Sequence, residues 1–203
     1  MSADPDPTGD RILEAALQTM ISFGIRRATV EEIARRAGVS HMTVYRRWPN
    51  KNELLVAVWL REAQTVFAAV DREVAALTSP EDKLVAGFTG IYWYVHTHPL
   101  MRQTVEMDPE SVLPVLTSGA GPGLDMATTY LAGHVSRSAG DIVDDPYGVA
   151  EIFVRLTHSL LLAPSARHAL ETKEDAEQYA RRYILPIARA LVPTPSQEAA
   201  SLR

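Results

Sequence analysis

Cysteine is absent from this chain of 203 residues, and no long uninterrupted apolar run occurs in it. Without cysteine, a disulfide framework and a thiolate metal site are excluded. No stretch approaches the ~18 consecutive apolar residues that a membrane-spanning helix needs, so we expect no membrane association. The first ten residues carry three aspartates and no cation, which does not fit a secretory signal. The composition therefore predicts a protein of the cytoplasm.

Charge is unevenly distributed along the chain. The net charge of −5 argues at first against binding to nucleic acid. Residues 8–61, however, hold nine Lys or Arg and only five acids, whereas residues 62–203 hold 11 Lys or Arg and 18 acids. Attraction to phosphates acts over about a Debye length, ~8 Å at physiological salt, so the local charge decides. This asymmetry predicts that the basic front part faces nucleic acid and that the acidic remainder stays away from it.

A helix-turn-helix pattern begins at residue 29. Its first helix has an apolar stripe at positions i, i+3, i+4 and i+7, formed by Val30, Ile33, Ala34 and Ala37. Thr29 precedes the stripe and Glu32 follows three residues later, the spacing of a capping box. Gly38 supplies the left-handed backbone needed to end the helix and turn. Ser40 can then cap a second helix, expected at residues 41–47.

The second helix of this pattern has an inner and an outer face. Val44 and Trp48 belong to the inner face. The outer positions are rich in hydrogen-bond donors and cations, and they are His41, Met42, Thr43, Tyr45, Arg46 and Arg47. Such a helix is suited to the major groove of DNA.

At these residues the chain resembles the TetR family of bacterial transcriptional regulators. The segments that carry the resemblance are residues 29–34, 37–40, 43–45 and 50–54, together with Trp48. It extends over residues 10–60. Met42, Arg47 and Trp48 stand where the family commonly has glycine, histidine and phenylalanine, so the family pattern does not give the operator sequence.

The resemblance implies an all-α fold in three parts. An N-terminal helix-turn-helix DNA-binding domain of three helices, residues 1–52, is joined by a long helix to a larger helical domain, residues 53–192, for ligand binding and dimerisation. Residues 193–203 are expected to be a disordered tail. Apolar spacing predicts helices at 9–22 (capped by Thr8), 52–77, 81–97, 124–138, 147–163 and 173–191, with shorter pieces at 100–106 and 111–116. Loops are expected at 118–123 and 140–146.

DNA contacts are implied first for Thr43, Tyr45 and Lys51. The Tyr45 hydroxyl suits a phosphate oxygen, and Lys51 stands in the first turn of the long helix, where backbone N–H groups favour an anion. The other candidates are Thr29, Ser40, His41, Met42, Arg46 and Arg47. The first two can equally serve only as helix caps, and the two arginines can be solvated charges instead of reading guanine.

The second domain is expected to form a homodimer and to hold an effector. The helix at 147–163 is apolar nearly all round, so we expect it to pair with the helix at 173–191 in a dimer interface. The alternative is that these residues form intramolecular core. Candidate ligand-binding residues are Phe88, Tyr92, Trp93, His96, Met101, Met107, Tyr130, Phe153 and His158, although each alone is also compatible with ordinary core. They favour an apolar or aromatic small molecule.

Catalytic chemistry has little basis in the sequence. It contains no glycine-rich phosphate loop, no serine or cysteine nucleophile signature and no His-Glu-x-x-His segment. We therefore predict no catalytic residues, no metal site and no cofactor. The predicted function is a ligand-responsive DNA-binding regulator, a repressor that binds a near-palindromic double-stranded operator as a homodimer. The alternative is a helical small-molecule or metal-binding protein without a DNA role.

Overall fold

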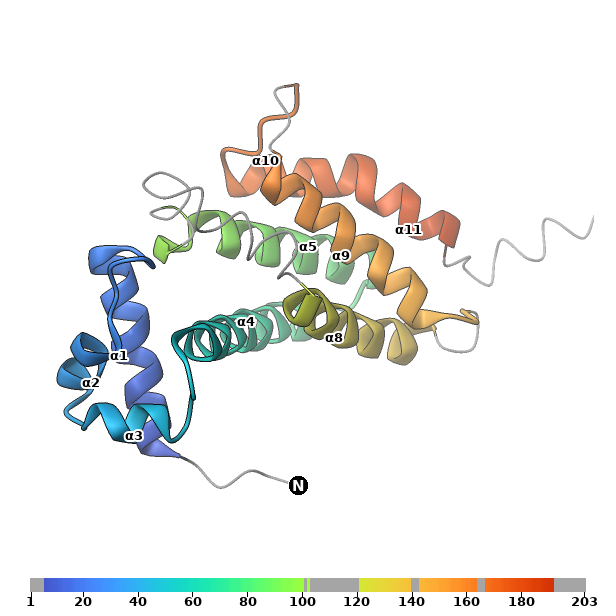
Figure 1. Cartoon of the computed structure of the whole chain (residues 1–203). Coiled ribbons are helices and arrows are strands. Elements are labelled where there is room, and N and C mark those ends of the chain that lie inside the picture. The colour runs from blue at the N-terminus through green and yellow to red at the C-terminus, as the bar shows by residue number, and fades with distance from the viewer. Residues whose placement is uncertain (1–5, 101, 103–120, 140–142, 164–166, 192–203) are drawn as a thin grey trace, which may run out of the picture. The chain divides into compact units, whose positions relative to one another are not determined.

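The computed structural model describes residues 6–100, 102, 121–139, 143–163 and 167–191, and every regular element in these ranges is a helix (Figure 1). The predicted all-α class is thereby confirmed. The chain forms two compact units, residues 1–65 with 97–119 and residues 66–96 with 120–203. The division passes through α4 (Lys51–Ala75) and near the end of α5 (Pro80–Thr97), and the division at residue 52 stays a prediction. Among the described residues, no helix is both long and apolar enough to cross a lipid bilayer.

The first unit begins with α1 (Pro7–Phe23), which starts two residues earlier than expected. Its cap is Asp6 instead of Thr8, because the Asp6 carboxylate accepts a hydrogen bond of 2.9 Å from the Gly9 N–H. Pro7 then occupies the first helical position, where the missing N–H costs nothing. Fully buried side chains hold this unit together, among them Ile12, Met20, Ile33, Val44 and Leu54.

The helix-turn-helix consists of α2 (Val30–Ala37) and α3 (His41–Tyr45). The Thr29 hydroxyl caps α2 by accepting from the Glu32 N–H at 3.2 Å. The expected capping box is only half formed, because the Glu32 carboxylate binds the Arg35 guanidinium at 2.8 Å. Gly38 has φ 66°, the left-handed conformation expected at the end of α2. The Ser40 hydroxyl caps α3, which ends two residues earlier than predicted.

Helix α4 (Lys51–Ala75) contributes to both units. It starts after Asn50, whose side chain caps it by accepting from the Glu53 N–H at 2.9 Å. Its 25 residues correspond to a length of about 37 Å. The helix ends two residues before the predicted position.

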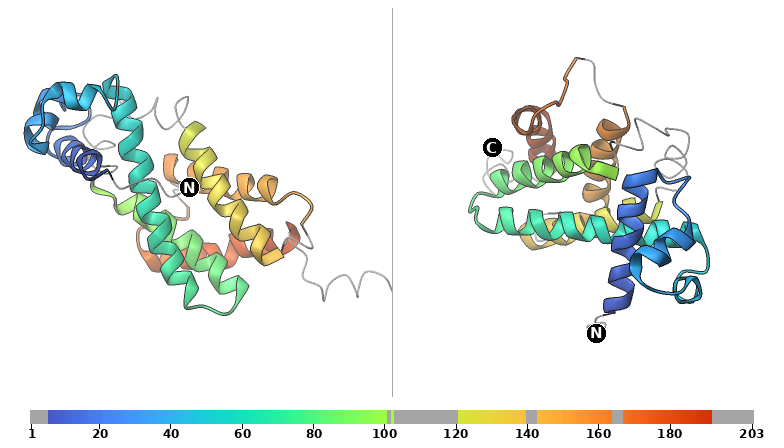
Figure 2. Two further views of the ribbon diagram at one scale, coloured as in Figure 1. Left: turned by 90° about the horizontal axis from the view of Figure 1, so that it is seen from below. Right: turned by 90° about the vertical axis from the view of Figure 1, so that its left-hand side faces the viewer.

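The second unit contains α5 (Pro80–Thr97, up to His96), α8 (Gly121–Ala139) and α9 (Pro146–Leu162). Helices α8 and α9 pack against each other (Figure 2). Residues 121–123, predicted as loop, form the first turn of α8, where a proline is tolerated because its N–H would be unsatisfied anyway. Asp145 caps α9 through the Gly148 N–H at 2.9 Å.

The last predicted helix is interrupted. It consists of α10 (Lys173–Tyr179), a π-helical turn η1 (Ala180–Ile184) and α11 (Leu185–Leu191). The inner side of η1 is buried, with Ala180 at 0% and Ile184 at 3% exposure, in a core that also contains Phe88, Tyr92 and Phe153. The helices expected at 100–106 and 111–116 lie outside the described residues except for Leu100 and Arg102, which are helical. The tail at 193–203 also lies outside them.

Candidate nucleic-acid interface

The outer face of α3 is exposed while its inner face is anchored in the core. Val44 is 1% exposed, whereas Met42 is 65% exposed. His41, Tyr45 and Arg46 are exposed as well, and the rings of His41 and Tyr45 meet edge to face at 6.4 Å. Val44 thus anchors this short helix in the core. The exposed side chains on its outer face form a surface that can contact a partner.

The hydroxyl groups at the start of α3 are bound to each other. Ser40 Oγ and Thr43 Oγ1 lie 2.9 Å apart, and the Thr43 N–H donates to Ser40 Oγ at 3.2 Å. Both side chains therefore have a local role in the folded chain. A hydroxyl has one donor and two acceptor positions, so this arrangement leaves capacity for a phosphate or a base edge.

Lys51 is held at the start of α4. Its ammonium donates to the Arg26 carbonyl oxygen at 3.1 Å, and partial burial lowers its pKa. Lys51 is the first residue of α4, so it belongs to the first turn, whose backbone N–H groups have no acceptor within the helix. This places a positioned cation beside a helix start, a combination that favours an anion such as a phosphate.

Arg47 has a partner that the sequence did not suggest. Its Nε and Nη2 donate to Asp6 Oδ2 at 2.9 Å and Oδ1 at 3.1 Å, respectively. The bonds from Arg47 and from the Gly9 N–H lower the pKa of the Asp6 carboxyl from 3.8 to about 2. The residue expected to read DNA is thus neutralised by the segment before α1. No local pattern in the sequence pointed to this pair, because Asp6 and Arg47 are 41 positions apart.

Several candidate ligand-binding residues of the second unit lie in aromatic clusters. Phe88 and Tyr92 stack at 6.0 Å, and both lie in the same core as Phe153. His96 stacks on Tyr92 at 5.7 Å and on Trp93 at 5.6 Å.

Tyr130 lies against α4. It stacks on Phe67 at 4.1 Å and donates to Asp71 at 2.7 Å. Burial, chiefly, and the bond to Asp71 raise the pKa of its hydroxyl. The buried Nε2 of His158 has no hydrogen-bond partner among the described residues. Met101 and Met107 lie outside the described residues.

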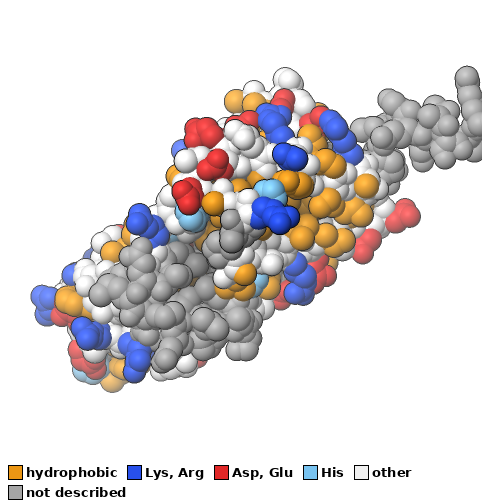
Figure 3. All heavy atoms as spheres, turned by 90° about the horizontal axis from the view of Figure 1, so that it is seen from above, with side chains coloured by type: hydrophobic (Ala, Val, Ile, Leu, Met, Phe, Trp, Pro, Cys, Tyr) orange, Lys and Arg blue, Asp and Glu red, His pale blue; other side chains and the backbone are white. Residues whose placement is uncertain are grey.

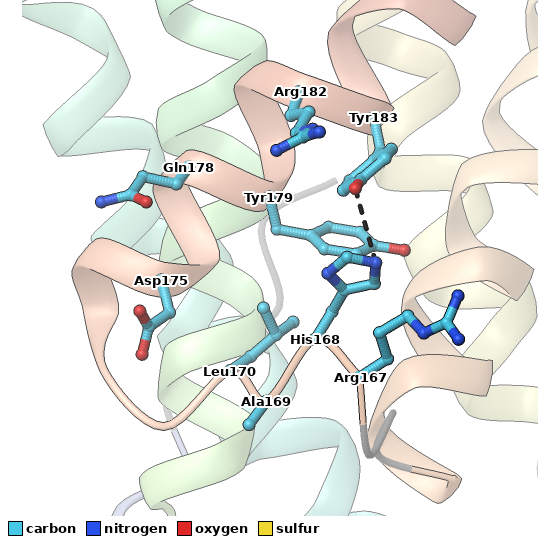
Figure 4. A pocket seen from close by; sticks show the side chains of 9 residues that line it. All are labelled: Arg167, His168, Ala169, Leu170, Asp175, Gln178, Tyr179, Arg182 and Tyr183. Carbon is cyan, nitrogen blue, oxygen red and sulfur yellow. Dashed lines mark hydrogen bonds between the residues drawn. The ribbon is translucent and has the colours of Figure 1, made fainter.

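Two pockets in the second unit are lined by other residues. One, of about 400 Å³, lies between α4, α5 and the α10–η1 segment, and its charged rim is closed by pairs such as Arg181 with Asp82 at 3.1 Å and Lys173 with Glu73 at 3.7 Å. The other, of about 250 Å³, lies between residues 167–170 and α10–η1 (Figure 4). No sequence pattern predicted either pocket, because their linings come from separate segments.

The arrangement of α1–α3, with an exposed α3 held by a glycine turn against α2, defines a helix-turn-helix DNA-binding protein. The profile of the bacterial regulatory proteins of the tetR family matches residues 12–58. An uncharacterized HTH-type transcriptional regulator of Mycobacterium bovis is 47% identical over 183 aligned residues, covering 79% of this chain and 96% of the relative. One from Mycobacterium tuberculosis is 32% identical with the same coverage. The chain belongs to the TetR family of bacterial transcriptional regulators.

The same conclusion about the fold follows from solved structures. The TetR family repressor AlkX from a Dietzia strain, implicated in biodegradation of n-alkanes, has a TM-score of 0.73 at 22% identity, covering 94% of this chain and 100% of AlkX. Its membership of the TetR family makes the chain a transcriptional regulator with a DNA-binding helix-turn-helix, in a family whose members bind operator DNA and small-molecule effectors, usually as homodimers. The alternative of a helical ligand- or metal-binding protein without a DNA role is not supported by this membership.

Proposed function

We propose that this chain is a repressor that binds a near-palindromic operator as a homodimer and is released from it by a small apolar or aromatic effector. The observation that carries the DNA part is the exposed outer face of α3 around a buried Val44, beside the fixed Lys51 ammonium. In this proposal Tyr45 and Lys51 bind phosphates, while His41, Met42 and Arg46 meet base edges. Thr29, Ser40 and Thr43 add hydroxyl contacts. A regulator of this kind acts in the cytoplasm.

Exposed apolar side chains on the last helices support the homodimer. Five large hydrophobic residues of α9 and α11 are at least 36% exposed, namely Tyr147, Ile152, Leu156, Leu162 and Ile187. Figure 3 shows hydrophobic side chains gathered on the face that these helices present. A patch of this kind favours contact with another protein surface, and pairing with a second copy would form a four-helix interface. A two-fold dimer then requires two half-sites about one helical turn or more apart, which is the reason for a near-palindromic operator.

Release by an effector follows from linkage. An effector releases the protein from DNA only if it binds one conformer more tightly than the other. The favoured conformer must be the one in which the two α3 helices of the dimer do not fit the operator. Helix α4, which belongs to both units, is the element through which a change in the second unit can reach the first. The aromatic residues Phe88, Tyr92, Trp93, Tyr130 and Phe153 favour an apolar or aromatic molecule.

One protein of similar fold has been solved with both DNA and a small molecule, and another is a repressor. A structure of AibR, with a TM-score of 0.51, contains isovaleryl coenzyme A and operator DNA. SmeT, with a TM-score of 0.53, is the repressor of a multidrug efflux pump. These examples support the proposal without naming the effector of this chain.

Selection of bound genomic fragments, followed by titration of the selected operator in a mobility-shift assay, tests the proposal. We expect Tyr45→Ala and Lys51→Ala each to weaken operator binding by about tenfold or more, because one phosphate contact is lost in each half-site. Lys83→Ala is the matched control, since Lys83 is an exposed lysine of α5 far along the chain from α3. Operator affinity that is unchanged in both α3–α4 variants, or reduced equally in the control, contradicts the proposal.

A further inference from the structure

The pocket of about 250 Å³ beside α10 combines aromatic rings with guanidinium groups. Its walls come from residues 167–170 and from the outer side of α10 and η1 (Figure 4). We propose that this pocket binds a small aromatic carboxylate, a molecule with a single ring and one anionic group. The proposal goes beyond the regulatory function, because that function assigns no ligand to this pocket and the binding does not require DNA.

The charge of the lining favours an anion. Three other arginines of the second unit are neutralised by carboxylates, in the pairs Arg155–Glu151, Arg181–Asp82 and Arg189–Glu81. Within the part of the chain that the structure describes, Arg167 and Arg182 form no such pair. The acid of the lining, Asp175, already accepts from the Thr172 N–H at 3.0 Å. Two guanidinium groups therefore line the pocket, and the carboxylate among the described lining residues, that of Asp175, is already engaged.

The rings of the lining favour a flat, unsaturated body. Tyr179 and Tyr183 lie 4.9 Å apart with their planes at 50°, and His168 lies 5.2 Å from Tyr183 at 58°. Because these rings are tilted and not stacked face to face, an added ring can meet them in the edge-to-face geometry that aromatic pairs prefer. The Arg182 guanidinium lies 5.5 Å from the centre of the Tyr183 ring. A carboxylate bound to Arg182 would thus hold its own ring beside Tyr183.

The position of the two guanidinium groups suits a small ligand. Figure 4 shows Arg167 and Arg182 on opposite sides of the ring group, with Asp175 away from Arg167. Guanidinium binds carboxylate with two parallel hydrogen bonds, which fixes the direction of the ligand as well as its charge. The volume is below the ~300–1,000 Å³ of pockets for drug-sized molecules, which limits the ligand to about one ring.

The backbone beneath these side chains is fixed. Tyr183 and Arg182 belong to the π-helical turn, whose inner residues Ala180 and Ile184 are buried in the core. π-Helical turns occur often at functional sites, because the extra residue redirects the outward side chains. The outward-facing side chains of η1 are therefore attached to backbone that is packed against the core.

Calorimetric titration of the full-length protein with benzoate tests the assignment. Benzylamine keeps the ring and reverses the charge, and acetate keeps the charge without the ring. We expect benzoate to bind about tenfold or more tightly than either, since the ring contacts and the charge-assisted bonds each contribute. Equal binding of benzylamine or acetate, or no heat with benzoate at millimolar concentration, overturns the proposal.

Variants locate the binding site. Arg182→Gln should weaken benzoate binding by about tenfold through loss of a charge-assisted bond. Arg72→Gln removes the same charge from an exposed arginine whose Nε donates to the Ala68 carbonyl oxygen of its own helix at 3.2 Å, and it should leave binding unchanged. Tyr183→Phe keeps the ring and should bind as the parent does, whereas Tyr183→Leu should not. Equal loss in Arg182→Gln and Arg72→Gln overturns the site.

Thermal unfolding of each variant, followed by circular dichroism, checks that the fold is kept. The calorimetric experiment measures heat of binding without DNA. A negative result there would therefore not contradict the proposed operator binding, and a negative mobility-shift result would not contradict benzoate binding.

Discussion

Replacing Asp6 with asparagine should increase DNA binding at low salt and make it more sensitive to salt. In the folded chain the Asp6 carboxylate binds the Arg47 guanidinium with two bonds, of 2.9 and 3.1 Å, and also caps α1. Asparagine caps a helix about as well as aspartate does. The substitution therefore keeps the start of α1 and removes the negative charge that neutralises Arg47.

The size of the effect follows from counterion release. Each phosphate neutralised by a cation contributes about −0.9 to the slope of log K against log salt. A dimer with two released Arg47 side chains should thus have a slope steeper by about 1.8, so that its affinity falls about 12-fold more than that of the parent between roughly 50 and 200 mM salt.

Fluorescence anisotropy with a labelled operator duplex, at several salt concentrations, measures this slope. Asp10→Asn is the control, because Asp10 is an exposed acid in the first turn of the same helix and its side chain does not bind Arg47. A double variant, Asp6→Asn with Arg47→Gln, should return to the parent slope. If Asp6→Asn and Asp10→Asn change the slope equally, the reasoning about Arg47 is refuted.

Three further predictions concern stability and assembly. Because the pKa of Asp6 is lowered from 3.8 to about 2 in the folded state, its contribution is present above pH 3.8 and is lost as the pH falls towards 2. The Gly9 amide resonance, followed by NMR, should shift in that window, and a shift confined to higher pH contradicts the pairing. Gly38→Ala should lower the free energy of unfolding by about 1–2 kcal/mol in a urea titration, because alanine must adopt the left-handed conformation there. No atom lies within 4 Å of an added Cβ at this position, so a much larger loss would point to another cause. Leu156→Asp should convert the dimer to a monomer in light scattering at micromolar concentration, because a charge would be buried in the proposed interface, while Val56→Asp, at an exposed valine of α4, should not.

Local features of the sequence predicted most of the helix-turn-helix. The Thr29 and Ser40 caps and the left-handed Gly38 were all expected, since capping depends on a few neighbouring residues. Helix ends were less certain. The helix α1 starts at Pro7, because Asp6 caps it better than Thr8. The capping box at α2 lost one half to Arg35, a competing partner one turn further along.

Long-range contacts decided what the side chains of the candidate sites do. Arg47 and Asp6 are 41 positions apart in the chain, and no periodicity connects them. The pocket beside α10 likewise unites residues before α10 with the outer side of η1, and the π-helical turn itself was predicted as ordinary helix. Phe88, Tyr92 and Phe153, which are separated along the sequence, share one core, and their part in a ligand site stays a prediction.

The sequence alone determined the class of protein, the order of the first helices and the face of α3 that is turned outward, because periodicity, caps and turn glycines act within a few residues. Only the tertiary structure decided which charges remain available to a partner. A guanidinium near a carboxylate is neutralised whatever their separation along the chain, so Arg47 is paired while Arg167 and Arg182 are left beside a ring-lined pocket.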